Sequence, residues 1–238
     1  QTRLLDGRRL QLAIIRIEKY LSFTEQYDFA SRKLLKYAME NICREVLESA
    51  NCHGECVDLG SDHLALLIVP PSSGDPVGAL EEVKLQILRW LQIPNTIAVS
   101  SPVEPRENLS HLYKQVLELS TLRFINGVDK IYTVDDLETG RNAEPAQWDQ
   151  HVKQLIQAVR LRNKAAMESC LQAISGQLYG LTYPECKLQL THLVYQLMRT
   201  FKRLSELQGM NGIQHYLERF SSLQEIMRWL RNELNEII

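Results

Sequence analysis

The sequence predicts an α/β (α+β) sheet domain followed by an all-α helical region. Three observations lead to this fold class. Strand-length apolar runs alternate with amphipathic helical patterns up to residue 134, no convincing strand occurs after residue 145, and hydrophobic residues make up 45% of the 238. A chain of this length and composition buries a core without disulfides or metal.

The periodicity of the first part identifies its elements in order. Residues 10–18 form a continuous apolar, β-branched run, as expected for a central strand covered on both faces. Residues 29–50 carry apolar side chains every four positions, which predicts a long amphipathic helix. Two short apolar runs separated by Gly60-Ser61 predict a β-hairpin. The order is strand, helix, strand, strand, helix, strand, helix, strand, at residues 10–18, 29–50, 55–59, 62–69, 80–91, 95–102, 109–117 and 130–134.

The second part is predicted to be helical throughout. Residues 135–145 have the composition of a linker, so we expect a sheet domain over 1–138 and a helical region over 139–238. Signals for helix ends include Asn163 as a cap, Pro184 in a first turn and Gly209 as a stop. Three apolar stripes mark helices at 148–159, 167–178 and 190–204. A capping box formed by Ser222 and Glu225 begins a fourth helix at 222–237.

Charge, cysteines and hydropathy limit the function classes. The formal net charge of −2 lacks the basic excess of a nucleic-acid-binding unit, so no DNA contact by this chain itself is expected. Five cysteines, an odd number, fall mostly within apolar stripes, which predicts a reducing, cytoplasmic location. No signal peptide and no apolar run near the roughly 18 residues of a membrane helix is found, so membrane contact is not expected. The start at Gln1 rather than Met indicates a piece of a longer protein.

The hairpin turn carries a motif. Residues 60–64 read Gly-Ser-Asp-His-Leu, and the first strand ends in "IIRIEKY" (14–20). A βααββαβαβ arrangement with a polar hairpin between its second and third strands resembles the diguanylate cyclase (GGDEF) domain, which implies a ferredoxin-like sheet. The resemblance places Arg16 and Glu18 at the two acidic positions of the family's Asp-x-Asp-x-Phe strand end. Gly60, Ser61, Asp62 and His63 fall on the signature itself.

The departures from that family imply a domain without catalytic residues, metal or cofactor. Phosphoryl transfer between nucleotides needs a divalent metal held by carboxylates. Arg16 stands at a metal-ligand position and repels a cation, while His63 replaces the second acid of the hairpin. Ser61 adds a side chain where the family's Gly lets phosphate approach, and Thr24 stands for an Asn that helps to hold guanine.

A resemblance over nearly the whole chain is to bacterial AraC-type transcription regulators of the response-regulator or membrane-sensor type. Residues 14–47 and 112–137 resemble the start and end of their degenerate GGDEF-like middle domain, and 148–238 resembles the helical linker and dimerisation region that follows. The resemblance implies a non-catalytic relay that couples an upstream sensor or receiver to a helix-turn-helix domain. It also implies a homodimer that contacts DNA only through that domain, which this chain lacks.

The sequence leaves several alternatives open. Arg16, Glu18, Asp62 and His63 form either a salt-bridged cluster capping the sheet or a pocket for an anionic ligand or neighbouring domain. The domain itself is alternatively a nucleotide or cyclic-dinucleotide receptor, or an unorthodox enzyme, and the helices from residue 145 on are alternatively a scaffold for a protein partner. The Cys52-His53-x-x-Cys56 group lacks the four ligands of a structural zinc site, so no metal is expected there.

Overall fold

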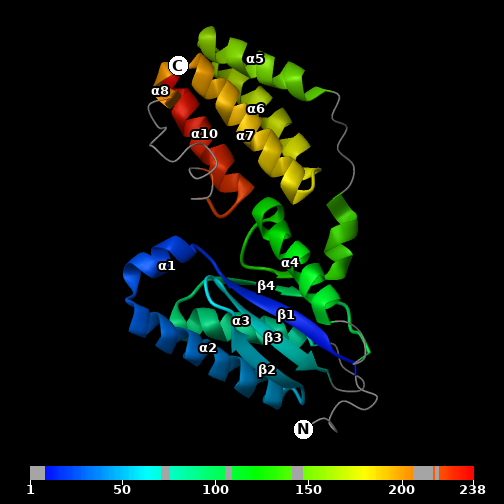
Figure 1. The fold of residues 1–238 in the computed structure, drawn as a ribbon. Helices are drawn as coiled ribbons and strands as arrows, with labels where there is room; N and C mark the ends of the chain where they lie inside the picture. Colours follow the sequence, from blue (N-terminus) through cyan, green and yellow to red (C-terminus); the bar gives the residue numbers. More distant parts are fainter. Residues whose placement is uncertain (1–8, 71–75, 105–108, 141–146, 206–216, 218–219) are drawn as a thin grey trace. The chain divides into compact units, whose positions relative to one another are not determined.

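The computed structural model describes residues 9–70, 76–104, 109–140, 147–205, 217 and 220–238 (Figure 1). The chain divides into two compact units. A sheet unit comprises residues 1–123 and 128–137, and a helical unit comprises residues 124–127 and 138–238. Most of the predicted loop at 70–78 and the stop signal at Gly209 lie outside the described residues.

A mixed five-stranded sheet forms the centre of the sheet unit, which confirms the predicted α/β fold class. The strand order is β2-β3-β1-β4-β5, with β1 antiparallel to both neighbours and β4 parallel to β5. The continuous apolar run of β1 therefore lies in the middle of the sheet, as predicted. The strands are β1 (Gln11–Ile17), β2 (His53–Asp58), β3 (His63–Val69), β4 (Asn95–Val99) and β5 (Ile131–Tyr132).

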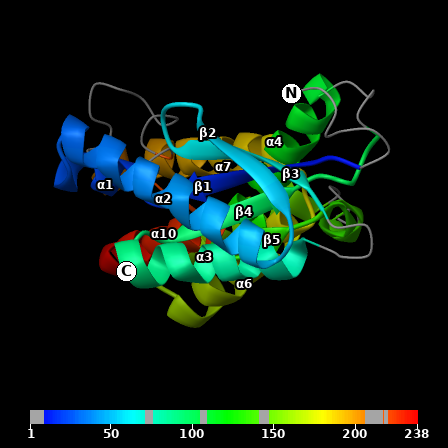
Figure 2. The ribbon, with the colours of Figure 1, turned by 90° about the horizontal axis from the view of Figure 1, so that it is seen from below.

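Helices cover both faces of β1. Its residues alternate in direction, so Ile15 and Ile17 join a core with α2 and α3, whereas Arg16 points to the other face and reaches Ser120 on α4. Figure 2 shows α2 and α3 beside the sheet from a second direction. The helices of this unit are α1 (Tyr20–Gln26), α2 (Phe29–Ser49), α3 (Val77–Leu91) and α4 (Leu109–Asn126).

Helix α1 is missing from the order that periodicity predicts, although the βααββαβαβ arrangement of the resemblance contains it. The helix has seven residues and buries only Phe23, so it leaves no repeated apolar stripe in the sequence. Asp28 then separates α1 from α2, because its side chain caps the Ser31 N–H at 2.7 Å.

The predicted terminal strand at 130–134 is too long. Strand β5 ends at Tyr132, because the Thr133 N–H donates to Asp136 Oδ2 at 2.7 Å and a 3₁₀-helix, η2 (Val134–Gly140), begins there. The first residues of the predicted linker are therefore helical rather than irregular, and residues 141–146 lie outside the described part. Strand β4 is also shorter than the predicted run at 95–102, because it ends at Val99.

The helical unit confirms the all-α prediction for the second part of the chain within its described residues. Asn163 caps α6 through the Ala166 N–H at 3.1 Å, and Pro184 lies in the first turn of α7, both as predicted. Ser222 caps α10, whereas the Glu225 carboxylate bonds the N–H of Ser221 rather than of Ser222. The helices are α5 (Trp148–Arg160), α6 (Lys164–Tyr179), α7 (Tyr183–Thr200), α8 (Lys202–Ser205) and α10 (Leu223–Ile237).

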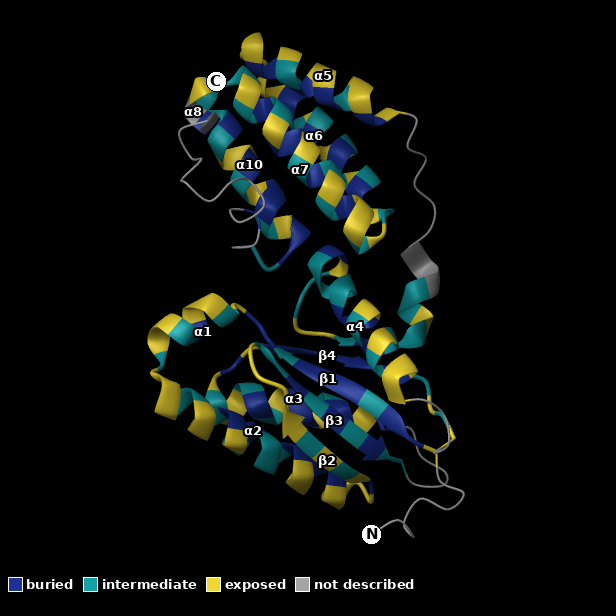
Figure 3. Cartoon of the chain, in the orientation of Figure 1, coloured by how far each residue is buried: buried dark blue, intermediate teal, exposed yellow. Residues whose placement is uncertain are grey.

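One predicted helix is divided in two. The apolar stripe over 190–204 predicts a single helix, but α7 ends at Thr200 because Phe201 is extended (φ −118°, ψ 111°), and α8 begins afterwards. Leu204 still reaches the helical core, so the stripe keeps its burial across the break. Figure 3 shows buried residues of α5, α6, α7 and α10 in dark blue. No helix among the described residues is long and apolar enough to cross a membrane.

Candidate functional site

The turn between β2 and β3 is tightly bonded. Gly60 and Ser61 both adopt positive φ angles, +82° and +45°, a conformation that favours glycine. The Gly60 N–H donates to Asp58 Oδ1 at 2.9 Å. Buried Lys36 on α2 donates its Nζ to the same oxygen at 2.7 Å and to the Ser61 carbonyl at 2.8 Å. The turn is therefore fastened to α2 through one ammonium group.

Lys36→Met is expected to loosen this turn. The substitution removes two charge-assisted bonds while it keeps the apolar stem, so we expect a loss of about 1–3 kcal/mol in unfolding free energy. Amide exchange at Gly60 and Ser61, followed by mass spectrometry, should accelerate more than exchange in β1. Lys33→Met, at an exposed position of the same helix, is the control. Unchanged exchange at the turn would contradict the role of Lys36.

Arg16, Asp62 and His63 come together at the end of the hairpin, as the sequence predicts. The β1–β3 register places Arg16 opposite His63. Arg16 Nε donates to Asp62 Oδ2 at 2.7 Å, and its Nη1 donates to Ser120 Oγ on α4 at 3.2 Å. His63 Nδ1 lies 3.0 Å from Asp62 Oδ1. This set of three side chains is called the hairpin cluster below.

The Asp62 carboxylate remains ionised in this cluster. Burial by itself raises its pKa, but the hydrogen bonds from His63 and Arg16 and their charges outweigh burial and lower the pKa of Asp62 well below its usual value. A depressed carboxyl pKa contributes stability above the unfolded pKa and loses it as the pH falls through the folded one. The Arg16–Asp62 ion pair is therefore complete at neutral pH.

Glu18 does not join the hairpin cluster through any described hydrogen bond, contrary to the expectation that all four charged residues meet. Its carboxylate, 2% exposed, accepts from Arg123 Nη1 on α4 instead. Burial raises the pKa of Glu18, and the Arg123 guanidinium opposes this rise. The second carboxylate oxygen, Oε1, is buried without a hydrogen-bond partner. A hydrogen bond with the Thr96 side chain and the Arg16 charge also oppose the rise, so Glu18 is a buried carboxylate stabilised mainly by Arg123.

Sequence reasoning missed the partners from the helices. Ser120 and Arg123 lie on α4, 104 and 105 positions from Arg16 and Glu18, and Lys36 lies on α2. The apolar pattern of α4 shows that one face is buried, but it does not show which strand lies beneath. The Thr24 hydroxyl bonds within its own helix, because it donates to the Leu21 carbonyl of α1 at 2.7 Å.

These side chains do not fit a divalent cation. A metal would take the Asp62 carboxylate, yet the Arg16 guanidinium already lies on it at 2.7 Å and repels any cation there. Glu18, the other acid of this region, is neutralised by Arg123. Among the described residues, no three His, Cys, Asp or Glu side chains are grouped so as to hold a metal ion, and this includes the Cys52-His53-x-x-Cys56 stretch.

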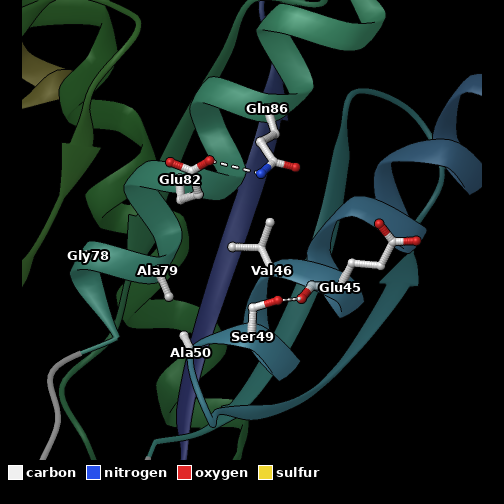
Figure 4. Close-up of a pocket in the computed structure, with 8 residues that line it drawn as sticks. All are labelled: Glu45, Val46, Ser49, Ala50, Gly78, Ala79, Glu82 and Gln86. Atoms are coloured by element: carbon white, nitrogen blue, oxygen red, sulfur yellow. Dashed lines mark hydrogen bonds between the residues drawn. The ribbon is translucent and has the colours of Figure 1, made fainter.

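A separate cavity lies between α2 and α3. It has a volume of about 520 Å³ and includes none of the residues of the hairpin cluster. Figure 4 shows two carboxylates at this cavity, from Glu45 and Glu82, and the latter accepts a hydrogen bond from Gln86 at 2.8 Å. Small residues, including Ala50 and Ala79, also line it. Its polar side chains from Ser49 and Gln86 are already bonded to the Glu45 carbonyl and the Glu82 carboxylate, so the cavity does not specify a ligand.

Among known proteins, the chain is similar only to solved structures. No family model and no curated protein matches the chain. The active GGEEF domain of a diguanylate cyclase from Vibrio cholerae is 13% identical, with a TM-score of 0.45, over 53% of this chain and 83% of that chain. The FimX GGDEF domain from Pseudomonas aeruginosa is 15% identical, with a TM-score of 0.45, over 53% and 81%.

The chain is also similar to the GGDEF domain of DgcB from Caulobacter crescentus, solved in complex with c-di-GMP. It is 10% identical, with a TM-score of 0.42, over 55% of this chain and 80% of that chain. At these identities the likeness concerns the arrangement of helices and strands and not the activity. What the sheet unit does is therefore argued from its own side chains.

Proposed function

We propose that the sheet unit is a non-catalytic regulatory domain of the GGDEF-like kind. The observation that carries this proposal is the ion pair between Arg16 and Asp62. Asp62 stands in the family's signature, and in this chain its carboxylate is bonded by a guanidinium at 2.7 Å rather than left free for a metal. Without a metal at that carboxylate, the charge that develops on transferring phosphates is not neutralised.

The charge balance near the hairpin also favours a structural arrangement. Arg16 is paired with Asp62, Lys36 with Asp58, and Arg123 with Glu18. A bound triphosphate would have to compete with these internal carboxylates for each cation. The proposed role is therefore to transmit a state through packing, and not to turn over a nucleotide.

The finer proposal rests on the sequence resemblance to AraC-type regulators. In this role the protein is a homodimer in the cytoplasm. The domains predicted from the sequence, residues 1–138 and 139–238, relay a signal from an upstream sensor or receiver to a downstream helix-turn-helix domain. Two helix-turn-helix patterns are expected in the hundred residues that follow this segment in the full-length gene, and their absence would exclude this role.

Incubation with GTP and Mg²⁺ or Mn²⁺ tests the absence of turnover. We expect no cyclic dinucleotide above the level of a protein-free control when the mixture is separated by anion-exchange chromatography. The matched control is Asp62→Asn, which removes the carboxylate while it keeps the size of the side chain. Product formed by the parent chain and lost in Asp62→Asn would overturn the proposal.

The second candidate function is a receptor for a guanine nucleotide or cyclic dinucleotide. The observation that favours it is the buried, unpartnered Glu18 Oε1, an acceptor of the kind that a guanine N–H satisfies. Calorimetric titration with GTP and with cyclic di-GMP separates the candidates. Saturable binding that is lost in Glu18→Gln supports the receptor function. The absence of a heat of binding with both ligands supports the relay function.

A further inference from the structure

Helix α2 lies along the edge strand β2, and their contacts follow one another in order. At one end, Lys36 Nζ donates to Asp58 Oδ1 at 2.7 Å. At the other end, the Leu47 side chain lies so close to Gly54 that a Cβ there would stand 2.5 Å from Leu47 Cδ1. Helix α2 and strand β2 therefore run in opposite directions along their contact, so that residues 36 to 47 of α2 lie beside residues 58 to 54 of β2.

Two cysteines occupy the middle of this contact. Cys43 lies one turn before Leu47 on the buried face of α2, and Cys56 lies between Gly54 and Asp58 on the same face of β2. Cys43 is fully buried, while Cys56 is partly exposed and packs against the same core. Both thiols are free, and neither contributes to the hairpin cluster.

The electrostatics of Cys43 agree with direct contact between the two thiols. A hydrogen bond with the Cys56 thiol and, after it, burial raise the pKa of Cys43 well above its ordinary value. Hydrogen-bonded thiols are close to the separation from which a disulfide closes, because the bond itself needs the two Cβ atoms about 4 Å apart. The contact between α2 and β2 places both cysteines in the same core, side by side along the helix and the strand.

We propose that Cys43 and Cys56 form a reversible disulfide when the chain meets a peroxide, and that this bond fastens α2 to the edge strand beside the hairpin. The inference does not rest on the regulatory function proposed above. It concerns a redox site that neither the hairpin cluster nor the diguanylate cyclase resemblance involves.

The chemistry is a two-electron oxidation by the peroxide. The more accessible Cys56 sulfur attacks one peroxide oxygen, the O–O bond breaks, and the products are a sulfenic acid at Cys56 and water or an alcohol. The Cys43 sulfur then attacks the Cys56 sulfur, the S–S bond forms, the S–O bond breaks, and the Cys43 proton leaves with the hydroxyl as water. A thiol reductant reverses the bond.

A third thiol, Cys52, provides a matched control. It is also buried in this core, but it precedes β2 and its Sγ contacts the Ala50 carbonyl at 3.8 Å rather than α2. The proposed bond shortens the free loop of the unfolded chain between 43 and 56, so the oxidised chain should unfold at a temperature several degrees higher. It should also slow exchange of the hairpin amides, because α2 holds the turn through Lys36.

The test is a thiol count on the whole chain. Fully reduced protein is treated with a slight excess of hydrogen peroxide, denatured and titrated with an aromatic disulfide reagent. The five free thiols are expected to fall to three and to return to five after dithiothreitol. Cleavage after Arg44 and Glu55 places Cys43, Cys52 and Cys56 on different peptides, so mass spectrometry identifies the linked pair.

Two variants keep the outcome unambiguous. Cys52→Ser should still lose two thiols and show the linked 43 and 56 peptides, whereas Cys56→Ser should keep all four of its thiols under the same treatment. A bond between Cys52 and Cys56, sulfinic acid at Cys56 with Cys43 still reduced, or a disulfide between two chains would each overturn the proposal. These readouts are independent of nucleotide turnover and of any DNA-binding partner.

Discussion

Arg123→Met is expected to lower the free energy of unfolding by about 3–5 kcal/mol at neutral pH, because it leaves the Glu18 carboxylate buried and unpaired. Glu18 is 2% exposed in its side chain and has no other described hydrogen-bonding cation. Chemical denaturation with urea, followed by circular dichroism, measures the loss. The same substitution at Arg231, whose ion pair with Glu168 is largely exposed, should cost no more than about 1 kcal/mol.

The pH dependence of this effect has a defined sign. The pKa of Glu18 is already raised in the folded chain, and removal of Arg123 raises it further. A carboxyl whose folded pKa is raised contributes stability that is present at low pH and is lost as the pH rises through the folded pKa. The destabilisation by Arg123→Met should therefore grow from pH 4 to pH 7.

A double variant separates charge from packing. Replacement of Glu18 by Gln together with Arg123→Met removes the unpaired charge, so this chain should be more stable at pH 7 than Arg123→Met alone. An equal loss at every pH, with no recovery in the double variant, would show that Arg123 stabilises the unit through its aliphatic stem and not through its charge.

Leu193→Ala is expected to destabilise the helical unit by about 2–5 kcal/mol, because it opens a cavity in a fully buried core. Leu193 on α7 is 0% exposed, whereas Leu188 on the same helix is 69% exposed. Leu188→Ala is therefore the matched control and should change stability by less than about 0.5 kcal/mol.

Tryptophan fluorescence assigns this loss to its unit. Trp148 and Trp229 belong to the helical unit, and Trp90 lies on the exposed side of α3 in the sheet unit. In a Trp90→Phe background, the emission reports the helical unit alone. An unchanged unfolding midpoint of the helical unit in Leu193→Ala would contradict the placement of Leu193 of α7 in the core.

Much of the fold is predictable from local pattern, and the misses have physical causes. Central strand β1 and helix α2 follow from unbroken apolar character and from four-residue spacing. Helix α1 buries one side chain and leaves no period to detect. The end of α7 depends on the backbone angles of Phe201 and not on any stop residue, so the stripe across it predicts one helix instead of two.

The candidate site is predictable only as far as the hairpin reaches. Arg16, Asp62 and His63 meet because neighbouring antiparallel strands bring their ends together, and the sequence order is enough to expect that. Glu18 departs from the expected group because α4 presents Arg123 to it. Nothing in the periodicity of α4 states which face of which strand it covers, so this pair could not be anticipated.

The sequence by itself determined the α/β class, the helical second part, the hairpin that carries Gly-Ser-Asp-His-Leu and the presence of Arg16 near the end of the first strand. Those features are local, because each depends on residue types within one element or on one turn. Only the tertiary structure decided that Arg16 lies on Asp62, that Glu18 is held by Arg123 and that Cys43 and Cys56 share one core. Such pairs depend on which helix packs on which strand and in what register, and that is set by the whole core and not by any single stretch of the chain.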